Sequence, residues 1–247
     1  MASKPLGEFF VHHLGPLGAR PTVVVVGRSN LNKRSTSIDS LLRALHKEGF
    51  SVCWYECMGG RYARLRQHAL EQIGHAWLNA FVRHHPLIGR LATKAVRLRL
   101  KLKYPKRRCF LLAKWADSSD PVHNLRRFLA KLAASEVMLL SHSAGGIAAS
   151  MSESDTSVKK VVCFGYPFKH PDKPDEAYRT AHLAAVSKPF LIIQGARDEY
   201  GTAQDAQRYA LSPHIEVCPI DSDHDYDSLD PSVLNQVSQL VLQFLKA

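Results

Sequence analysis

The sequence lacks any hydrophobic run that approaches the roughly eighteen uncharged residues needed to span a membrane. Its first residues, MASKPLGEFF, contain no apolar block before a small-residue cleavage site, so we expect no signal peptide. Cysteines are few, odd in number and mostly placed inside apolar runs: Cys53, Cys57, Cys109, Cys163 and Cys218. We therefore expect no disulfide framework, and a reducing, cytoplasmic compartment.

The sequence also has little that could bind a metal ion. Cys53 and Cys57 alone do not supply the closely paired ligands of a zinc site. A cluster of aspartates lacks the glycine and the terminal glutamate of a calcium loop, and solvated turn residues are the better interpretation: Asp221, Asp223, Asp225 and Asp227. We expect neither a metal nor an organic cofactor.

Acidic residues are absent from one long segment. Residues 72–116 contain 11 Lys or Arg and no Asp or Glu, whereas the whole chain has 33 basic and 22 acidic residues. Removing the segment leaves 22 basic and 22 acidic residues, so this one block carries the net charge of +11. Its apolar residues recur at helical spacing, which predicts one or two amphipathic helices broken near Pro86: Trp77, Phe81, Ile88, Leu91, Ala95, Leu98 and Leu102.

We interpret this basic block as a helical insertion, at about residues 58–114, in a single domain that spans residues 1–247. Gly59 and Gly60 mark its start, and Tyr104 and Pro105 mark its end, before a candidate short extended piece at 109–113. Two interpretations remain open. The block is either a solvated helical face, or a surface that binds an acidic protein, a nucleic acid or an anionic membrane.

Outside the insertion, short β-branched runs alternate with helical patterns. This alternation is typical of an α/β fold, in which a doubly wound, mostly parallel sheet carries helices on both faces. With 45% hydrophobic residues, the chain can bury a sizeable core. The predicted strands are 22–26, 51–55, 136–141, 160–164, 190–194 and 215–219, and the predicted helices include 37–47, 121–134 and 231–245. Asp230 is the expected N-cap of the last helix.

The strongest chemical signal is the segment VMLLSHSAGGIAA at 137–149. An apolar strand enters small residues around Ser143 and then a helix, so the turn must be tight and must project that serine. The strained backbone and the close helix leave room for Gly145 and Gly146 and for little else. The Ala144 amide, at the start of the helix, is a candidate donor to an oxyanion. Ser143 alone could equally be a helix cap.

Two further polar loops supply partners for this serine. Asp198 lies just past the predicted strand 190–194, and His224 lies in a polar loop after the last strand. The carboxyl ends of parallel strands gather at one edge of a sheet, so the three side chains should meet there. Each has an ordinary alternative. Asp198 could cap a helix that begins near Gly201, and its neighbour Arg197 could form a surface ion pair. His224 is one of thirteen histidines and could be an ordinary loop residue.

With these residues, the sequence resembles the α/β-hydrolase superfamily, and the resemblance covers nearly the whole chain except the basic insertion. The chain order Ser143, Asp198, His224 is the order of its triad, although Ser141 replaces the first glycine of the usual Gly-x-Ser-x-Gly. The segments FGYPFKHPDKPD at 164–175, His182 with the following leucine, and QGARD at 194–198 look like small, lid-poor members. These are related to dienelactone hydrolases and to the hydrolase-like subunit of the non-specific-lethal histone acetyltransferase complex.

The resemblance implies an eight-stranded, mostly parallel sheet, with Ser143 as nucleophile, His224 as base and Asp198 as acid. It also implies an oxyanion amide in the loop after strand 22–26, where many members have His-Gly and this chain has Gly-Arg-Ser-Asn at 27–30. Arg28 and Ser29 are the candidates. The usual cap position, 166–188, is short, so the basic insertion is a candidate lid.

The expected function is therefore that of a serine hydrolase of the carboxylesterase or thioesterase type. It would act on a small-molecule ester or thioester through an acyl-enzyme intermediate. The alternative from another class is a hydrolase-like scaffold that has kept the triad but works by binding an anionic partner through the basic insertion.

Overall fold

The computed structural model describes residues 2–18, 21–27, 36–57 and 120–247, with isolated positions between 88 and 102. The chain forms two compact units. One comprises Met1–Lys4, Val11–Tyr55 and Asp120–Ala247, and the other comprises Pro5–Phe10 and Glu56–Ser119. The predicted insertion at 58–114 lies, apart from those isolated positions, outside the described residues. Its boundaries, the extended piece at 109–113 and a lid role remain predictions.

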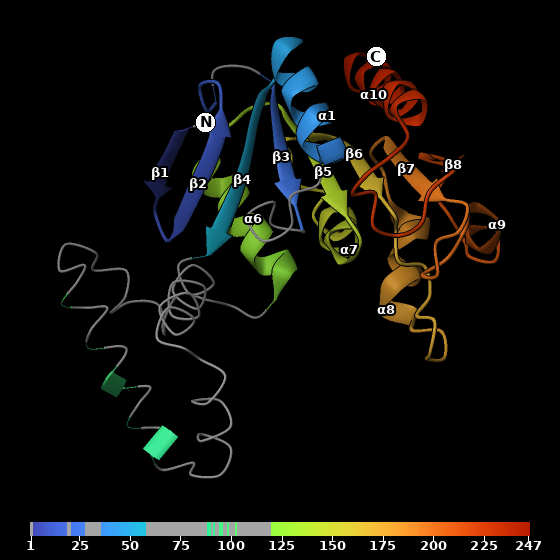
Figure 1. The fold of residues 1–247 in the computed structure, drawn as a ribbon, viewed down its shortest axis with the longest axis horizontal. Helices are drawn as coiled ribbons and strands as arrows, with labels where there is room; N and C mark the ends of the chain where they lie inside the picture. The colour runs from blue at the N-terminus through green and yellow to red at the C-terminus, as the bar shows by residue number, and fades with distance from the viewer. Residues whose placement is uncertain are drawn as a thin grey trace. The chain divides into compact units, whose positions relative to one another are not determined.

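Eight strands form one sheet in the order β1-β2-β4-β3-β5-β6-β7-β8 (Figure 1). Their bounds are β1 Ala2–Leu6, β2 Phe9–Leu14, β3 Thr22–Val26, β4 Ser51–Cys57, β5 Val137–His142, β6 Val158–Phe164, β7 Phe190–Gly195 and β8 Ile215–Ile220. Strand β3 pairs in parallel with β4 and β5, and the pairs from β5 through β8 are also parallel. The predicted mostly parallel α/β sheet is confirmed.

Strands β1 and β2 were not predicted as strands from the residue pattern. A two-residue turn joins them, so they run antiparallel. Strand β1 is exposed along most of its length and contains a proline, so it has none of the apolar alternation that marks a strand in a sequence.

The principal helices begin and end close to the predicted positions: α1 Thr36–Lys47, α6 Pro121–Leu132 and α10 Pro231–Lys246. Asp230 caps α10, because its Oδ1 accepts the Ser232 amide at 2.8 Å. Helix α6 ends two residues before its predicted end, because Ala133 takes the left-handed conformation at φ 50° and closes the helix.

Helices cover both faces of the sheet. Helix α1 contacts α10 on one face, and α6 contacts α7 (Ala144–Met151) on the other (Figure 1). The first face buries Leu41 and Leu45 of α1 and Val241 of α10 against alternate residues of β3, β5, β6 and β7. The strands are thus apolar on both faces, as a doubly wound sheet requires.

The parallel strands bring the loops after β5, β7 and β8 to one edge of the sheet. The connection between β6 and β7 holds only two short helices, α8 Ala177–Thr180 and the 3₁₀ helix η1 Ala181–Ala185. The described residues therefore contain no multi-helix cap at that position. Nor does any helix in the described ranges combine the length and the apolar character needed to cross a bilayer.

Candidate active site

Ser143 occupies a strained turn between β5 and α7. Its backbone has φ 53° and ψ −129°, a conformation that costs a non-glycine residue on the order of 1–3 kcal/mol. The turn is fixed on both sides, because the Ser143 amide donates to the Phe164 carbonyl at 3.0 Å and the Ser143 carbonyl accepts the Gly146 amide at 2.7 Å. Ser143 occupies the N-cap position of α7, but its side chain makes no capping hydrogen bond, so its hydroxyl does not serve as a helix cap.

The glycines after Ser143 are required by sterics, as the sequence predicts. A Cβ on Gly145 would lie 2.5 Å from the Val26 carbonyl oxygen, and a Cβ on Gly146 would lie 2.5 Å from Cys163 Sγ. Ser141 fits in place of the usual glycine, because its buried hydroxyl donates to the Val162 carbonyl of β6 at 3.0 Å. The departure from the common motif is thus accommodated by one hydrogen bond.

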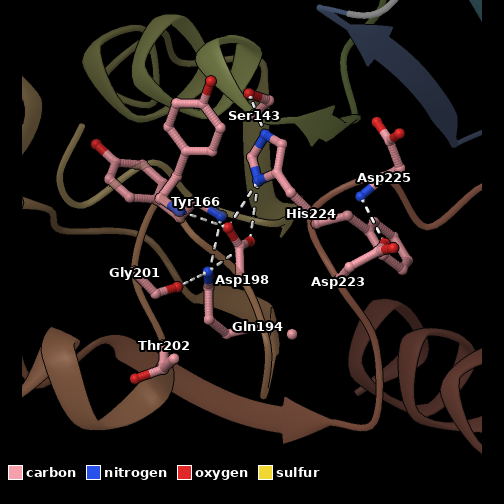
Figure 2. Close-up of polar contacts among 12 residues, drawn as sticks. Ser143, Tyr166, Gln194, Asp198, Gly201, Thr202, Asp223, His224 and Asp225 are labelled. Carbon is pink, nitrogen blue, oxygen red and sulfur yellow. Dashed lines mark hydrogen bonds and ion pairs between the residues drawn. The ribbon is translucent and has the colours of Figure 1, made fainter. Parts of the chain in front are cut away.

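The structure brings Ser143, His224 and Asp198 together (Figure 2). His224 Nε2 lies 2.8 Å from Ser143 Oγ, and His224 Nδ1 lies 2.9 and 3.0 Å from the two carboxylate oxygens of Asp198. The Asp198 side chain is fully buried, and that of His224 is 16% exposed. A hydroxyl, an imidazole and a buried carboxylate in series can take a proton from the hydroxyl and stabilise the resulting imidazolium.

The alternative carboxylates near His224 have other partners. The Asp221 side chain is exposed and pairs with Arg197, which confirms Arg197 in a surface ion pair. Asp223 Oδ1 accepts the Asp225 amide at 3.0 Å. Asp198 is not a helix cap either, because Thr202 caps α9 (Ala203–Ala206) with a capping box. No group of three or more potential metal ligands occurs among the described residues.

Aromatic rings surround the imidazole of His224. The Tyr200 ring lies 4.4 Å and the His142 ring 5.3 Å from it, centroid to centroid. His142 Nε2 also donates to the His224 carbonyl at 2.8 Å, which ties the histidine loop to the end of β5. Sequence reasoning missed both residues, because a tyrosine two positions after the acid and a histidine before the nucleophile have no periodic signal.

Two more residues that shape the site were missed. Gly165, at φ 59°, follows β6 directly and lies beside the acid and base, where a Cβ would lie 3.1 Å from Asp198 Oδ2 and 3.2 Å from His224 Nδ1. The Tyr226 hydroxyl accepts the Gly195 amide at 2.6 Å and donates to the Ile193 carbonyl at 3.2 Å. Burial raises the pKa of the Tyr226 phenol, so the phenol keeps the proton that it donates.

A cavity of about 510 Å³ opens at Ser143. Its lining includes Gly27 at the end of β3, Ala144, Arg179 and Tyr200. Ala144 is the first residue of α7, so its amide has no acceptor within the helix. This agrees with an oxyanion donor, whereas Arg28 and Ser29, the other candidates, lie outside the described residues.

The buried cysteines are poor nucleophiles. Desolvation raises the pKa of both the Cys53 and the Cys163 thiol to about 12, so both stay protonated at neutral pH. Cys163 lies against α7, close to the elbow, but Gly146 packs directly over its sulfur. Among the described side chains near the elbow, Ser143 is therefore the better candidate for covalent chemistry.

Comparison with known proteins agrees with this geometry. Residues 93–244, more than half of the chain, match the family model of the α/β hydrolase domain. The sequence matches none of the curated proteins with which it was compared.

Solved structures are similar in fold. Dienelactone hydrolase from Anabaena variabilis is 17% identical, with a TM-score of 0.55 over 99% of this chain and 95% of that one. A carboxylesterase of the thaumarchaeon Nitrososphaera gargenis is 14% identical, with a TM-score of 0.58 over 99% and 98%. The thioesterase domain from the curacin biosynthetic pathway is 10% identical, with a TM-score of 0.56 over 98% of each. At these identities the likeness extends to the fold alone.

Proposed function

The chain belongs to the α/β hydrolase family, and we propose that it is a serine carboxylesterase or thioesterase with Ser143 as nucleophile. The observation that carries the proposal is the hydrogen-bonded series from Ser143 Oγ through His224 to the buried Asp198 carboxylate. The strained elbow places the serine hydroxyl beside a cavity large enough for a small acyl group.

The mechanism follows from the donors and acceptors of this series. His224 Nε2 takes the Ser143 proton as Oγ attacks the carbonyl carbon, and Asp198 stabilises the imidazolium. The Ala144 amide donates to the oxyanion. When the tetrahedral intermediate collapses, the carbon–oxygen or carbon–sulfur bond breaks and His224 gives its proton to the alcohol or thiol. A water molecule then attacks the acyl-enzyme by the same steps, which frees the acid and Ser143.

A panel of acyl esters and matched acyl thioesters of increasing chain length tests this function. We expect turnover that peaks at a chain length the cavity can hold, and no turnover by Ser143→Ala on the same substrate. Substrate hydrolysis that Ser143→Ala retains in full, or wild-type protein inert toward every ester and thioester, would contradict the proposal.

A second candidate function rests on the basic insertion: docking to an anionic membrane. Four large apolar side chains of its described positions are exposed, at 47% for Ile88, 63% for Leu91, 59% for Leu98 and 72% for Leu102. Their separations of three, seven and four residues place them along one stripe of a helix. An apolar stripe within a segment that has only basic charges is typical of a helix that lies in an anionic lipid interface.

We expect the quadruple change of Arg97, Arg99, Lys101 and Lys103 to Gln to weaken binding to phosphatidylserine vesicles at low salt. Wild-type binding should fall steeply with added salt, because the Debye length shrinks from about 30 Å at 0.01 M to about 10 Å at 0.1 M. Hydrolysis of a small neutral ester should stay within about twofold of wild type, since none of the four residues belongs to the proposed triad. Vesicle sedimentation measures the binding.

The matched control removes the same charge elsewhere, from exposed lysines outside the insertion: Lys4, Lys131, Lys159 and Lys173 to Gln. An equal loss of vesicle binding in both variants would show that only the net charge of the protein matters, and would contradict a specific role of the insertion. Unchanged binding in the insertion variant, or tighter binding to nucleic acid than to vesicles, would overturn the membrane assignment.

A further inference from the structure

Gln194 is a fully buried polar residue in the apolar strand β7, one residue from the end of that strand. A buried amide that lacks partners costs free energy, so its hydrogen bonds explain its place. Gln194 Oε1 accepts the Tyr166 amide at 2.9 Å, while Nε2 donates to Asp198 Oδ2 at 2.9 Å and also to the Gly201 carbonyl (Figure 2).

These partners fix which end of the amide faces Asp198. The Tyr166 backbone amide can only donate, and the Gly201 carbonyl can only accept, so Oε1 must face Tyr166 and Nε2 must face Asp198. The opposite orientation would lose every one of these hydrogen bonds. Gln194 can therefore only donate, and not accept, in its hydrogen bond to the acid of the proposed triad.

The carboxylate of Asp198 has two such donors besides the imidazole. The Tyr200 amide donates to Oδ1 at 2.9 Å and Gln194 donates to Oδ2 at 2.9 Å. Each carboxylate oxygen is thus held by one neutral group while both face His224 Nδ1. Two hydrogen bonds, one to each oxygen, fix the position of this buried carboxylate.

We propose that Gln194 is a positioning residue that holds the ionised Asp198 carboxylate against His224 Nδ1. This inference rests on the proposed function, because it gives Gln194 its role through the triad. It goes beyond the triad because the acid is oriented by a residue of strand β7 as well as by the Tyr200 amide in its own loop.

The first test is Gln194→Met, which keeps a similar volume and removes the donor. A hydrogen bond to a charged group corresponds to a factor of roughly ten to one hundred, so kcat should fall by about that factor with KM nearly unchanged. The control is Ser212→Ala. Like Gln194→Met, it removes a buried hydrogen-bond donor, here the hydroxyl that donates to the Val186 carbonyl at 2.6 Å, but Ser212 lies outside the site. We expect that control to lose thermal stability and keep kcat.

The second test is Gln194→Glu, which separates positioning from a merely structural role. Burial and the facing Asp198 charge raise the pKa of the introduced carboxyl. While protonated, it can accept from Tyr166 and donate its one proton to Asp198, although it then leaves the Gly201 carbonyl without the second hydrogen that the amide supplies. When it ionises, it loses that proton, can no longer donate to Asp198, and places a second negative charge beside the Asp198 carboxylate. Relative to wild type at the same pH, activity should therefore be partly retained at the lower pH values and lost as pH rises. The ratio of kcat in Gln194→Glu to wild-type kcat should fall with pH, whereas the ratio for Gln194→Met should not.

A spectroscopic readout keeps this inference distinct from the proposed function. The low-field proton resonance of His224 Nδ1–H, assigned by its loss in His224→Ala, should shift or broaden in Gln194→Met even if no substrate turns over. An unchanged resonance in the folded variant would overturn the role of Gln194, whether or not the protein is an esterase. So would a Gln194→Glu variant that follows the wild-type pH profile, or a Gln194→Met variant with wild-type kcat.

Discussion

Replacing His224 with alanine is expected to lower kcat by about 10⁴-fold or more on any ester that the protein hydrolyses. The imidazole lies 2.8 Å from the Ser143 hydroxyl and is the group placed to take its proton. Without the imidazole, no base takes the proton of the Ser143 hydroxyl, which is a weak nucleophile while protonated, and the leaving group receives no proton. Steady-state kinetics on the best substrate of the ester panel measure the effect.

The matched control for His224→Ala is His123→Ala, which changes a histidine on α6 that is not among the residues lining the cavity. It should keep wild-type kcat. The double variant Ser143→Ala with His224→Ala should be no slower than either single variant, because the two residues act as a unit. Additive losses in the double variant would argue that the two side chains act independently.

Replacing Asp198 with asparagine is expected to lower kcat by roughly 10³- to 10⁴-fold. The change is nearly isosteric, so the fold should persist, but it removes the charge that stabilises the imidazolium. The new amide can also donate toward His224 Nδ1, which favours the wrong tautomer of the base. Kinetics and a thermal unfolding midpoint, measured together, separate lost chemistry from lost stability.

The control for the acid is Asp221→Asn, since the Asp221 carboxylate is exposed and pairs with Arg197. We expect wild-type kcat from it. If Asp198→Asn kept most of its activity while Asp221→Asn or Asp223→Asn lost it, the acid would have been assigned to the wrong residue.

The sheet and the three polar loops could be predicted because each rests on a local pattern. The strand 22–26 was predicted with the bounds that β3 has, since four consecutive valines between turn residues leave few alternatives. Ser143 was identifiable because a tight turn needs small residues, and the structure puts a Cβ at Gly145 only 2.5 Å from a backbone oxygen.

The remaining parts of the site depend on contacts between distant segments. Gln194 contacts Tyr166 and Asp198, which belong to different loops, and nothing in the run FLIIQG marks its amide as a partner of the acid. A side chain at Gly165 is likewise disfavoured by its φ of 59° and by Tyr226, Asp198 and His224, which lie beside it only in the folded chain. No period along the chain carries such information, so these residues emerge only from the folded structure.

Covalent labelling with a fluorophosphonate, followed by peptide mass spectrometry, tests directly whether Ser143 is the nucleophile. A serine beside a base and an oxyanion donor reacts readily, so we predict a single adduct on Ser143 and no adduct on Ser143→Ala or on heat-unfolded protein. His224→Ala should label far more slowly. An adduct on Ser141, or labelling that survives Ser143→Ala, would contradict the assignment of Ser143 as the nucleophile.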